Sequence, residues 1–288
     1  DILELAAERV VVFDGAMGTM LLASGLPTGG TPELWNIEQP DTVEEIHRKY
    51  FDAGSDVVHT NTFGGTALKL DDKGHGDKAE QVNLAAVQVA KKACPEGRFV
   101  AGDIGPTGRM LPPVGTATVE ELEEAFFQQA KALLQGGVDL ISVETMFSLE
   151  ESLAAVRAAK KAGDGPVVAA VTYNKTPNGF FTMMGESVAQ SAEAFEAAGC
   201  DVFASNCTLG SSDMLALVKD MKAATTLPVL IQPNAGKPVA DDGGPTRYEQ
   251  TAQEFAQDIK RIVDAGADMV GGCCGTNAEF IREMVKHI

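Results

Sequence analysis

The sequence predicts an α/β fold in which eight strand–helix units close into a single-domain (β/α)8 TIM barrel spanning residues 1–288. Short apolar runs rich in β-branched residues recur along the chain, and each is followed by a segment with helical spacing of apolar residues. These runs are continuously apolar, as is typical of parallel strands covered on both faces. The eight predicted strands are residues 10–13, 56–60, 98–102, 139–143, 167–172, 201–205, 228–232 and 268–271.

Four of the intervening helices are predicted to begin at a capping box. In this motif a Ser or Thr side chain and a Glu or Gln three residues later satisfy the free backbone N–H groups of the first turn. The four pairs are Thr42 with Glu45, Thr118 with Glu121, Ser148 with Glu151, and Ser187 with Gln190.

A Gly-x-Asp pattern precedes every second predicted strand, beginning at Gly54, Gly137, Gly199 and Gly266. Glycine suits the left-handed position just past a helix end, so the pattern marks repeated helix-to-strand junctions. An open doubly wound sheet is the alternative, but no G-x-G-x-x-G motif follows the first strand. Two long loops, residues 104–117 and 234–247, are expected to belong to an active site.

The amino-acid composition argues against some classes of function. The chain has 23 Lys and Arg against 41 Asp and Glu, a formal net charge of −18, which repels phosphate backbones and anionic lipid headgroups. We therefore expect no nucleic-acid or membrane partner. Neither a membrane-spanning run nor a signal peptide is evident, so a cytoplasmic location is expected. Five cysteines, an odd and sparse number, argue against a disulfide framework and leave metal binding or thiol chemistry open.

Active sites of such barrels lie at the carboxyl ends of the strands, so the polar residues there are the functional candidates. Cys94 and Cys200 lie at the other end and are interpreted as small buried hydrophobic residues. The candidates are Asp14, Asn61, Thr62, Asp103, Glu144, Tyr173, Asn174, Asn206, Cys207, Asn234, Cys273 and Cys274.

Three of these candidates, Cys207, Cys273 and Cys274, suggest a zinc site with one open position, since catalytic Zn²⁺ commonly takes three protein ligands. The alternative is three buried thiols beside turn glycines. Three thiolates make zinc a poor activator of water but a good holder of another soft ligand. A thiol bound there would lose its proton near neutral pH and stay nucleophilic, which indicates alkylation of a thiol.

Several strings in the chain resemble the homocysteine-binding domain of cobalamin-dependent methionine synthase, within the family of homocysteine methyltransferases that also use betaine or S-methylmethionine. The resemblance spans essentially the whole chain, and G-G-C-C-G-T with the upstream N-C is its most specific part. The strings are D-G-A-M-G-T at 14–19, T-N-T-F-G at 60–64, D-I-G-P-T-G at 103–108, V-E-T at 143–145, N-C at 206–207, P-N-A-G at 233–236 and G-G-C-C-G-T at 271–276.

This resemblance implies a TIM barrel that holds one Zn²⁺ through Cys207, Cys273 and Cys274, with the sulfur of homocysteine as the fourth ligand. It further implies that carboxylates matching Asp14 and Glu144 take the substrate ammonium. Backbone amides and hydroxyls matching Gly15 and Thr62 would receive its carboxylate. Asn234 matches an oxygen ligand that fills the fourth zinc position before the substrate arrives.

The expected reaction is transfer of a methyl group to homocysteine to give methionine. The resemblance implies methylcobalamin as the donor, carried on another domain or protein, because no corrinoid motif D-x-H-x-x-G appears in the chain. A small sulfonium or ammonium donor, such as S-methylmethionine or betaine, or a different thiol acceptor, is the alternative. Other classes also stay open: a phosphate-binding lyase of this fold, or a non-catalytic thiol or metal sensor.

Purely structural roles are the alternative for several of these residues. Asp14 and Glu144 could be strand-end carboxylates bonded to loop amides, and Asp103 could cap the turn that follows it. His59 lies inside a predicted strand, where a packed or hydrogen-bonded core role is expected.

Overall fold

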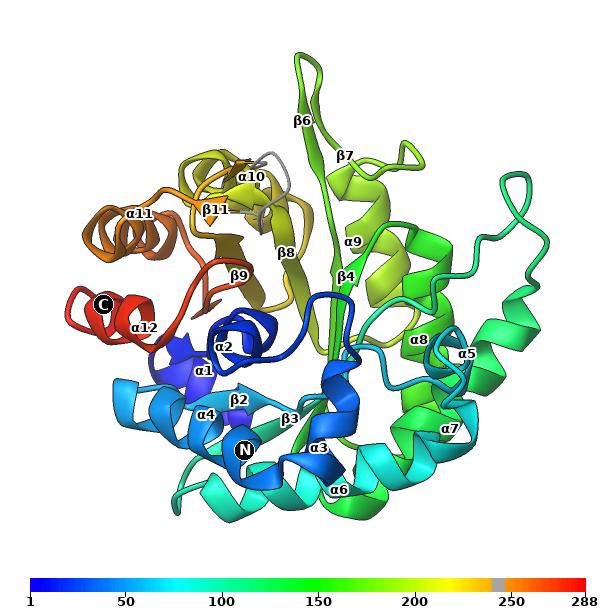
Figure 1. Ribbon diagram of the computed structural model, residues 1–288. Coiled ribbons are helices and arrows are strands. Elements are labelled where there is room, and N and C mark those ends of the chain that lie inside the picture. Colours follow the sequence, from blue (N-terminus) through cyan, green and yellow to red (C-terminus); the bar gives the residue numbers. More distant parts are fainter. Residues whose placement is uncertain (240–246) are drawn as a thin grey trace.

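The computed structural model describes residues 1–239 and 247–288, and its strands form a barrel surrounded by helices (Figure 1). Eight parallel strands pair in the order β1-β12-β9-β8-β5-β4-β3-β2, and a bridge between Phe13 and Val57 joins the two ends of this sheet. The predicted (β/α)8 barrel is confirmed. The strands are β1 (Val11–Val12), β2 (Val57–His59), β3 (Phe99–Ile104), β4 (Leu140–Met146), β5 (Val167–Val171), β8 (Val202–Gly210), β9 (Val229–Asn234) and β12 (Met269–Val270).

Helices follow the strands and pack around the sheet, while α1 (Ile2–Glu8) precedes β1. Short 3-10 turns at Pro32–Leu34 and Gly76–Lys78 interrupt the first two connections. The remaining helices are α2 (Met17–Ala23), α3 (Trp35–Glu38), α4 (Pro40–Ala53), α5 (Ala67–Asp71), α6 (Ala79–Ala93), α7 (Val119–Gly136), α8 (Leu149–Ala162), α9 (Val188–Ala197), α10 (Ser211–Ala224), α11 (Ala252–Asp264) and α12 (Ala278–Val285).

Two apolar clusters explain why the strands are continuously apolar. One lies between the sheet and the helices, with Val58, Val100 and Ile231 among its members. The other fills the barrel interior and includes Phe13, and α1 contributes Ile2 to it. Because both faces of the sheet are buried, alternating polar positions are absent from the middle of the strands.

The four Gly-x-Asp junctions share one hydrogen-bonding arrangement. Their glycines have φ between 78° and 111°, so each adopts the left-handed conformation that the pattern predicts. Each aspartate carboxylate accepts the backbone N–H of a valine on the preceding strand and pairs with a basic side chain. The sets are Asp56 with Val12 and Arg98, Asp139 with Val100 and Lys91, Asp201 with Val167 and Lys160, and Asp268 with Val229 and Lys222.

Two of the four predicted capping boxes are complete, at Thr118 and Ser187. Ser148 caps α8, but the Glu151 side chain accepts from the Thr107 N–H and hydroxyl instead of returning to the cap. The prediction at Thr42 is wrong: α4 begins at Pro40, whose fixed φ suits the first helical position. Two further capping boxes, not predicted from the sequence, begin α1 at Asp1 and α11 at Thr251.

Two antiparallel pairs lie outside the barrel sheet. The first, β6 (Asn174–Thr176) with β7 (Gly179–Phe181), projects from the rim (Figure 1). The second, β10 (Pro238–Val239) with β11 (Arg247–Tyr248), belongs to the predicted long loop 234–247, of which residues 240–246 lie outside the described residues. The loop after β3 is also long, as predicted, since α7 begins only at Val119.

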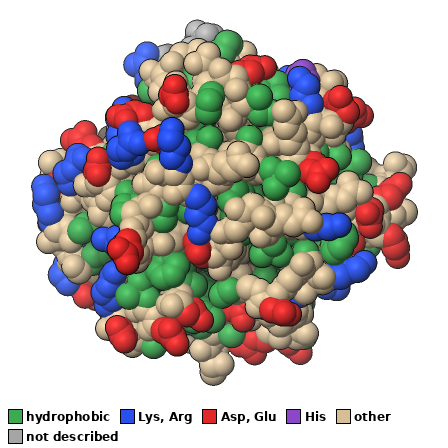
Figure 2. All heavy atoms as spheres, turned by 90° about the horizontal axis from the view of Figure 1, so that it is seen from below, with side chains coloured by type: hydrophobic (Ala, Val, Ile, Leu, Met, Phe, Trp, Pro, Cys, Tyr) green, Lys and Arg blue, Asp and Glu red, His purple; other side chains and the backbone are tan. Residues whose placement is uncertain are grey.

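Charged side chains of both signs are mixed on the face that Figure 2 shows, where Lys and Arg lie beside Asp and Glu. None of the described helices combines the length and the apolar character that crossing a bilayer requires.

Asp201→Ala tests the junction arrangement. Its carboxylate accepts the Val167 N–H at 2.7 Å, and Val167 is buried, so the variant leaves a buried donor without its partner. We expect the free energy of unfolding, measured in urea, to fall by about 2 kcal/mol. Asp164→Ala serves as the control. Asp164 is exposed in the turn before β5, so its loss should change the free energy of unfolding little. Equal stability of the two variants would contradict the arrangement.

Candidate active site

The structure gathers the predicted site residues at the carboxyl ends of the strands. They come from segments far apart in the sequence, which the barrel brings to one rim. Asp14 follows β1, Glu144 lies in β4, Cys207 lies in β8, Asn234 ends β9, and Cys273 and Cys274 follow β12.

The sulfur atoms of Cys207, Cys273 and Cys274 all lie within 4.8 Å of one another, and the Sγ atoms of Cys207 and Cys274 are 3.8 Å apart. Tetrahedral zinc with Zn–S bonds of about 2.3 Å requires sulfurs about 3.8 Å apart. The three side chains are half-buried, so a ligand has access from the rim. In the part of the chain that is described, they form the one group of His, Cys, Asp and Glu side chains with metal-site geometry.

The proximity of the three thiols shifts the pKa values of Cys273 and Cys274 in opposite directions. Hydrogen bonds from Cys207 and Cys273 lower the pKa of Cys274 to about 3. The neighbouring Cys207 and Cys274, together with burial, raise the pKa of Cys273 well above its ordinary value. Three adjacent sulfurs therefore resist ionising together. A divalent cation among them would remove that repulsion.

Backbone hydrogen bonds join the cysteine pair to the end of β9. Cys273 donates its N–H to the Pro233 carbonyl at 2.8 Å, and the Cys274 carbonyl accepts from the Ala235 N–H at 2.9 Å. Asn234 lies between these two contacts. Its Oδ1 is buried and has no hydrogen-bond partner among the described residues, which leaves an oxygen lone pair free for a cation.

The segment after Cys274 turns at Gly275, whose φ of +84° is unfavourable for other residues. A side chain there would also lie 2.4 Å from Cγ of Tyr248, because the Tyr248 ring packs directly on this glycine. Burial, and then the neighbouring Cys274, raise the pKa of Tyr248. Tyr248, which directly follows the 234–247 loop, thus packs against the segment that carries Cys273 and Cys274.

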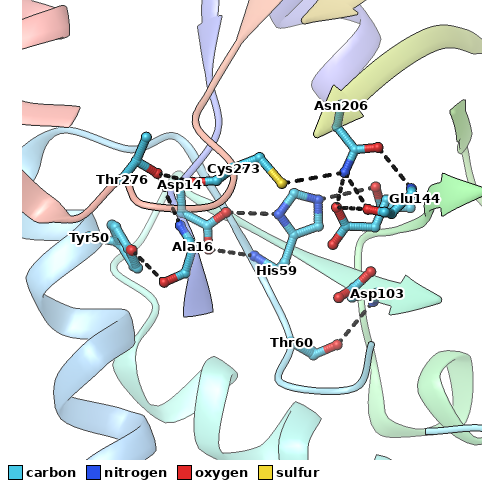
Figure 3. Close-up of polar contacts among 12 residues, drawn as sticks. Asp14, Ala16, Tyr50, His59, Thr60, Asp103, Glu144, Asn206, Cys273 and Thr276 are labelled. Atoms are coloured by element: carbon cyan, nitrogen blue, oxygen red, sulfur yellow. Dashed lines mark hydrogen bonds and ion pairs between the residues drawn. The ribbon is translucent and has the colours of Figure 1, made fainter. Parts of the chain in front are cut away.

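Asp14 is buried and bonded to His59. Its carboxylate accepts the His59 backbone N–H at 2.9 Å and lies 2.8 Å from Nδ1 of the ring (Figure 3). Nε2 of the ring lies 3.1 Å from Ser142 Oγ. Burial lowers the pKa of His59, but the Asp14 and Glu144 carboxylates outweigh it, so the net shift is upward. His59 is thus hydrogen-bonded in the strand, as expected, and its ring also binds Asp14, a predicted substrate-binding residue.

Two further carboxyl groups, those of Asp103 and Glu144, lie near Asp14. Burial and then the Glu144 charge raise the pKa of Asp103 well above its ordinary value, and burial raises that of Glu144. Asp103 Oδ1 is buried without a hydrogen-bond partner among the described residues. Three crowded carboxyl groups around one imidazole make this end of the site suited to a cationic group.

Gly15 and Thr62, the residues expected to receive a substrate carboxylate, lie on the loops after β1 and β2. A Cβ at Gly15 would lie 2.7 Å from Thr276 Oγ1, so the backbone is closely approached there. The Thr62 hydroxyl donates to the Asp103 carbonyl at 2.7 Å and lies 2.6 Å from Thr60 Oγ1. This hydroxyl already has partners within the protein.

Asn206 connects the carboxyl end to the cysteine end (Figure 3). Its amide donates to Glu144 and lies 3.9 Å from Cys273 Sγ. Sequence analysis placed Asn206 at a strand end without a role. Its position directly before Cys207 was the available signal, but the contact with Glu144 joins residues 62 apart.

Cys94 and Cys200 lie away from this site. Cys200 is buried, its thiol donates to the Val202 carbonyl at 2.9 Å, and burial raises its pKa to about 12. This environment agrees with the predicted structural role of Cys200. Cys94 is only half-buried against the apolar cluster between sheet and helices, and not buried as predicted.

His59→Gln tests the ion pair with Asp14. Because the folded-state pKa of His59 is raised, the pair stabilises fully below the unfolded-state pKa of about 6.5 and loses its effect as pH rises through the folded-state value. Unfolding free energies measured from pH 5.5 to 9 should show a wild-type advantage that shrinks as pH rises.

His47→Gln is the matched control for that series. His47 is fully buried, and burial, with His59, lowers its pKa to about 3. Its pH dependence has the opposite sign, since the unfolded chain binds the proton more readily: the wild type should lose stability relative to this variant as pH falls below about 6.5. Parallel pH profiles for the two variants would refute the assignment.

This chain matches a known protein family in sequence and solved structures in fold. The model of the homocysteine S-methyltransferase family matches residues 11–288. The homocysteine methyltransferase MmuM of Escherichia coli superposes with a TM-score of 0.79 for its metallated form and 0.80 for its oxidized form. Each alignment covers 97% of this chain and 96% of the other, at 21% identity, and shows the shared fold.

Curated relatives include the methionine synthases of Mycobacterium tuberculosis and Mycobacterium leprae, each 35% identical over 306 aligned positions. The alignments cover all of this chain but 25% of each relative, so the chain spans about a quarter of their length. With a family model that matches nearly its whole length, the chain belongs to the homocysteine S-methyltransferase family.

Proposed function

We propose that residues 1–288 form one cytoplasmic methyltransferase domain that transfers a methyl group to the thiol of homocysteine and yields methionine. One observation carries this proposal: a cluster of three thiols lies on the same rim as a cluster of carboxyl groups. Homocysteine carries a thiol at one end and an ammonium at the other. The two clusters match these two ends.

Zn²⁺ is the metal that this donor set fits, with Cys207, Cys273 and Cys274 as its ligands. The sulfur spacing and the unpartnered Oδ1 of Asn234 support this fit, since that oxygen could occupy a fourth position before the substrate arrives. Zinc held there would lower the pKa of an acceptor thiol while leaving its sulfur nucleophilic.

The chain's own residues would orient the acceptor. Asp14, held by His59, and Glu144, held by Asn206, accept hydrogen bonds from the ammonium. The carboxylate is received at the backbone near Gly15 and at Thr62, whose hydroxyl would exchange its bond to the Asp103 carbonyl. Fixing both ends of the acceptor aligns its sulfur with the incoming methyl carbon.

The methyl donor is proposed to be methylcobalamin carried by a corrinoid-binding domain or protein. The match to a quarter of the methionine synthases supports this proposal, since a donor domain would lie outside this chain. The thiolate forms the new S–C bond, and the electron pair of the donor–methyl bond leaves with the donor. S-methylmethionine and betaine are the alternative donors.

Metal analysis of the cysteine variants tests the metal site. We expect about one zinc per chain in the purified protein and its loss in Cys207→Ala and Cys273→Ala, because two thiolates hold zinc far less tightly than three. Cys200→Ala, which removes a buried thiol outside the cluster, should retain zinc. A folded, active protein without metal would disprove the zinc proposal.

A donor panel tests the reaction itself. Zinc-loaded protein with homocysteine and methylcobalamin, S-methylmethionine or betaine should form methionine with at least one donor, and fastest with methylcobalamin. Zinc binding without methionine from any donor would instead favour a thiol or metal sensor.

Glu144→Gln separates the two ends of the site. The variant loses the negative charge offered to the ammonium, so we expect homocysteine affinity to fall about tenfold or more with unchanged zinc content. Titration calorimetry and metal analysis provide the two readouts. Glu150→Gln, an exposed glutamate on the adjoining helix α8, should alter neither. Zinc loss in Glu144→Gln would contradict the division of roles.

A further inference from the structure

Asn206 is fully buried on β8 and makes contacts in two directions. Its Nδ2 donates to the Glu144 carboxylate, lies 2.7 Å from Thr145 Oγ1 and lies 3.9 Å from Cys273 Sγ. Its Oδ1 accepts the Thr145 backbone N–H at 2.8 Å. One amide group thus touches the proposed ammonium site, the backbone beside it and a proposed metal ligand (Figure 3).

The backbone around Asn206 is strained on both strands that it joins. Among residues 1–239 and 247–288, the non-glycine residues with positive φ are Thr145, Cys207 and Thr208, at 56°, 57° and 59°. Thr145 is the residue that Asn206 holds, and the other two follow Asn206 directly. Such conformations persist only where the surrounding structure enforces them, and they concentrate at functional sites.

Both strands also lose their regular register at this height. The pairing of β4 with β5 shifts between Val143 and Met146, and that of β8 with β9 shifts between Asn206 and Gly210. Irregularities of this kind re-aim side chains next to active sites. Since β5 lies between β4 and β8 in the sheet, the Asn206–Glu144 contact spans the rim above an intervening strand.

We propose that Asn206 is a positioning residue that fixes Glu144 relative to the cysteine cluster and so sets the span between the ammonium and thiol subsites. This inference rests on the proposed function and deepens it: acceptor selectivity would depend on Asn206. Acceptors that bear an ammonium at the correct distance from the thiol would be favoured over thiols that lack it.

Asn206→Ala tests the inference in protein loaded with Co²⁺, whose thiolate absorption bands report thiol binding without turnover. Homocysteine and 4-mercaptobutanoate, which has the same thiol and carboxylate but no ammonium, are titrated separately. We expect the variant to retain Co²⁺ but to lose about tenfold of the wild-type preference for homocysteine, because Glu144 is no longer held. A purely structural role would weaken both ligands equally and leave the ratio unchanged.

Asn206→Leu is a second variant that keeps the approximate size of the side chain but has no amide donor for Glu144 and adds no charge beside the ammonium subsite. It should show the same loss of preference, and it decides the test alone if the alanine variant fails to fold. Ser205→Ala is the matched control, since this buried neighbour donates to the Val171 carbonyl of β5 and should keep the wild-type ratio.

The outcomes separate this inference from the function on which it rests. If the wild-type protein binds neither Co²⁺ nor homocysteine, the proposed function fails. If it binds both and the Asn206 variants keep its preference, only the positioning role fails. Loss of Co²⁺ from a folded Asn206→Leu protein would assign the residue to the metal site alone and overturn the proposal.

Discussion

All eight strands of the barrel sheet run in the same direction, and the bridge from Phe13 to Val57 closes that sheet on itself. Closure sends every strand end to one rim, so side chains from β1, β4, β8 and the β12 loop meet although long stretches of chain separate them. The aspartate contacts at the opposite end hold adjacent strands in place. The site depends on this closure, because no single segment contains enough of it.

Acidic side chains are concentrated at the rim that carries the candidate site. Three thiols and three carboxyl groups lie at this rim. Burial, and then neighbouring charges, raise the pKa values of Asp103 and Glu144, and the neighbouring thiols raise that of Cys273. His59 offsets part of this charge from within the protein. A divalent cation at the sulfurs and an ammonium at the carboxyl groups would offset the rest, so the proposed metal and substrate would each favour binding of the other.

Backbone strain is concentrated around the amide of Asn206. Asn206 adjoins all three non-glycine positive-φ residues of the described chain, and the register irregularities of β4 and β8 coincide with it. The barrel thus holds a strained segment where the proposed metal and substrate subsites meet. Such strain is retained where an alignment of groups matters more than local stability.

Local sequence determined the strand positions, the left-handed glycine at each Gly-x-Asp junction, and the strand-end location of the cysteines, because these features depend on neighbours a few residues away. Only the tertiary structure decided which strand ends face one another. It paired His59 with Asp14, drew Glu151 from its cap to Thr107, and set Asn206 against Glu144. Those contacts join residues 44 to 62 positions apart, and barrel closure rather than local periodicity brings such residues together.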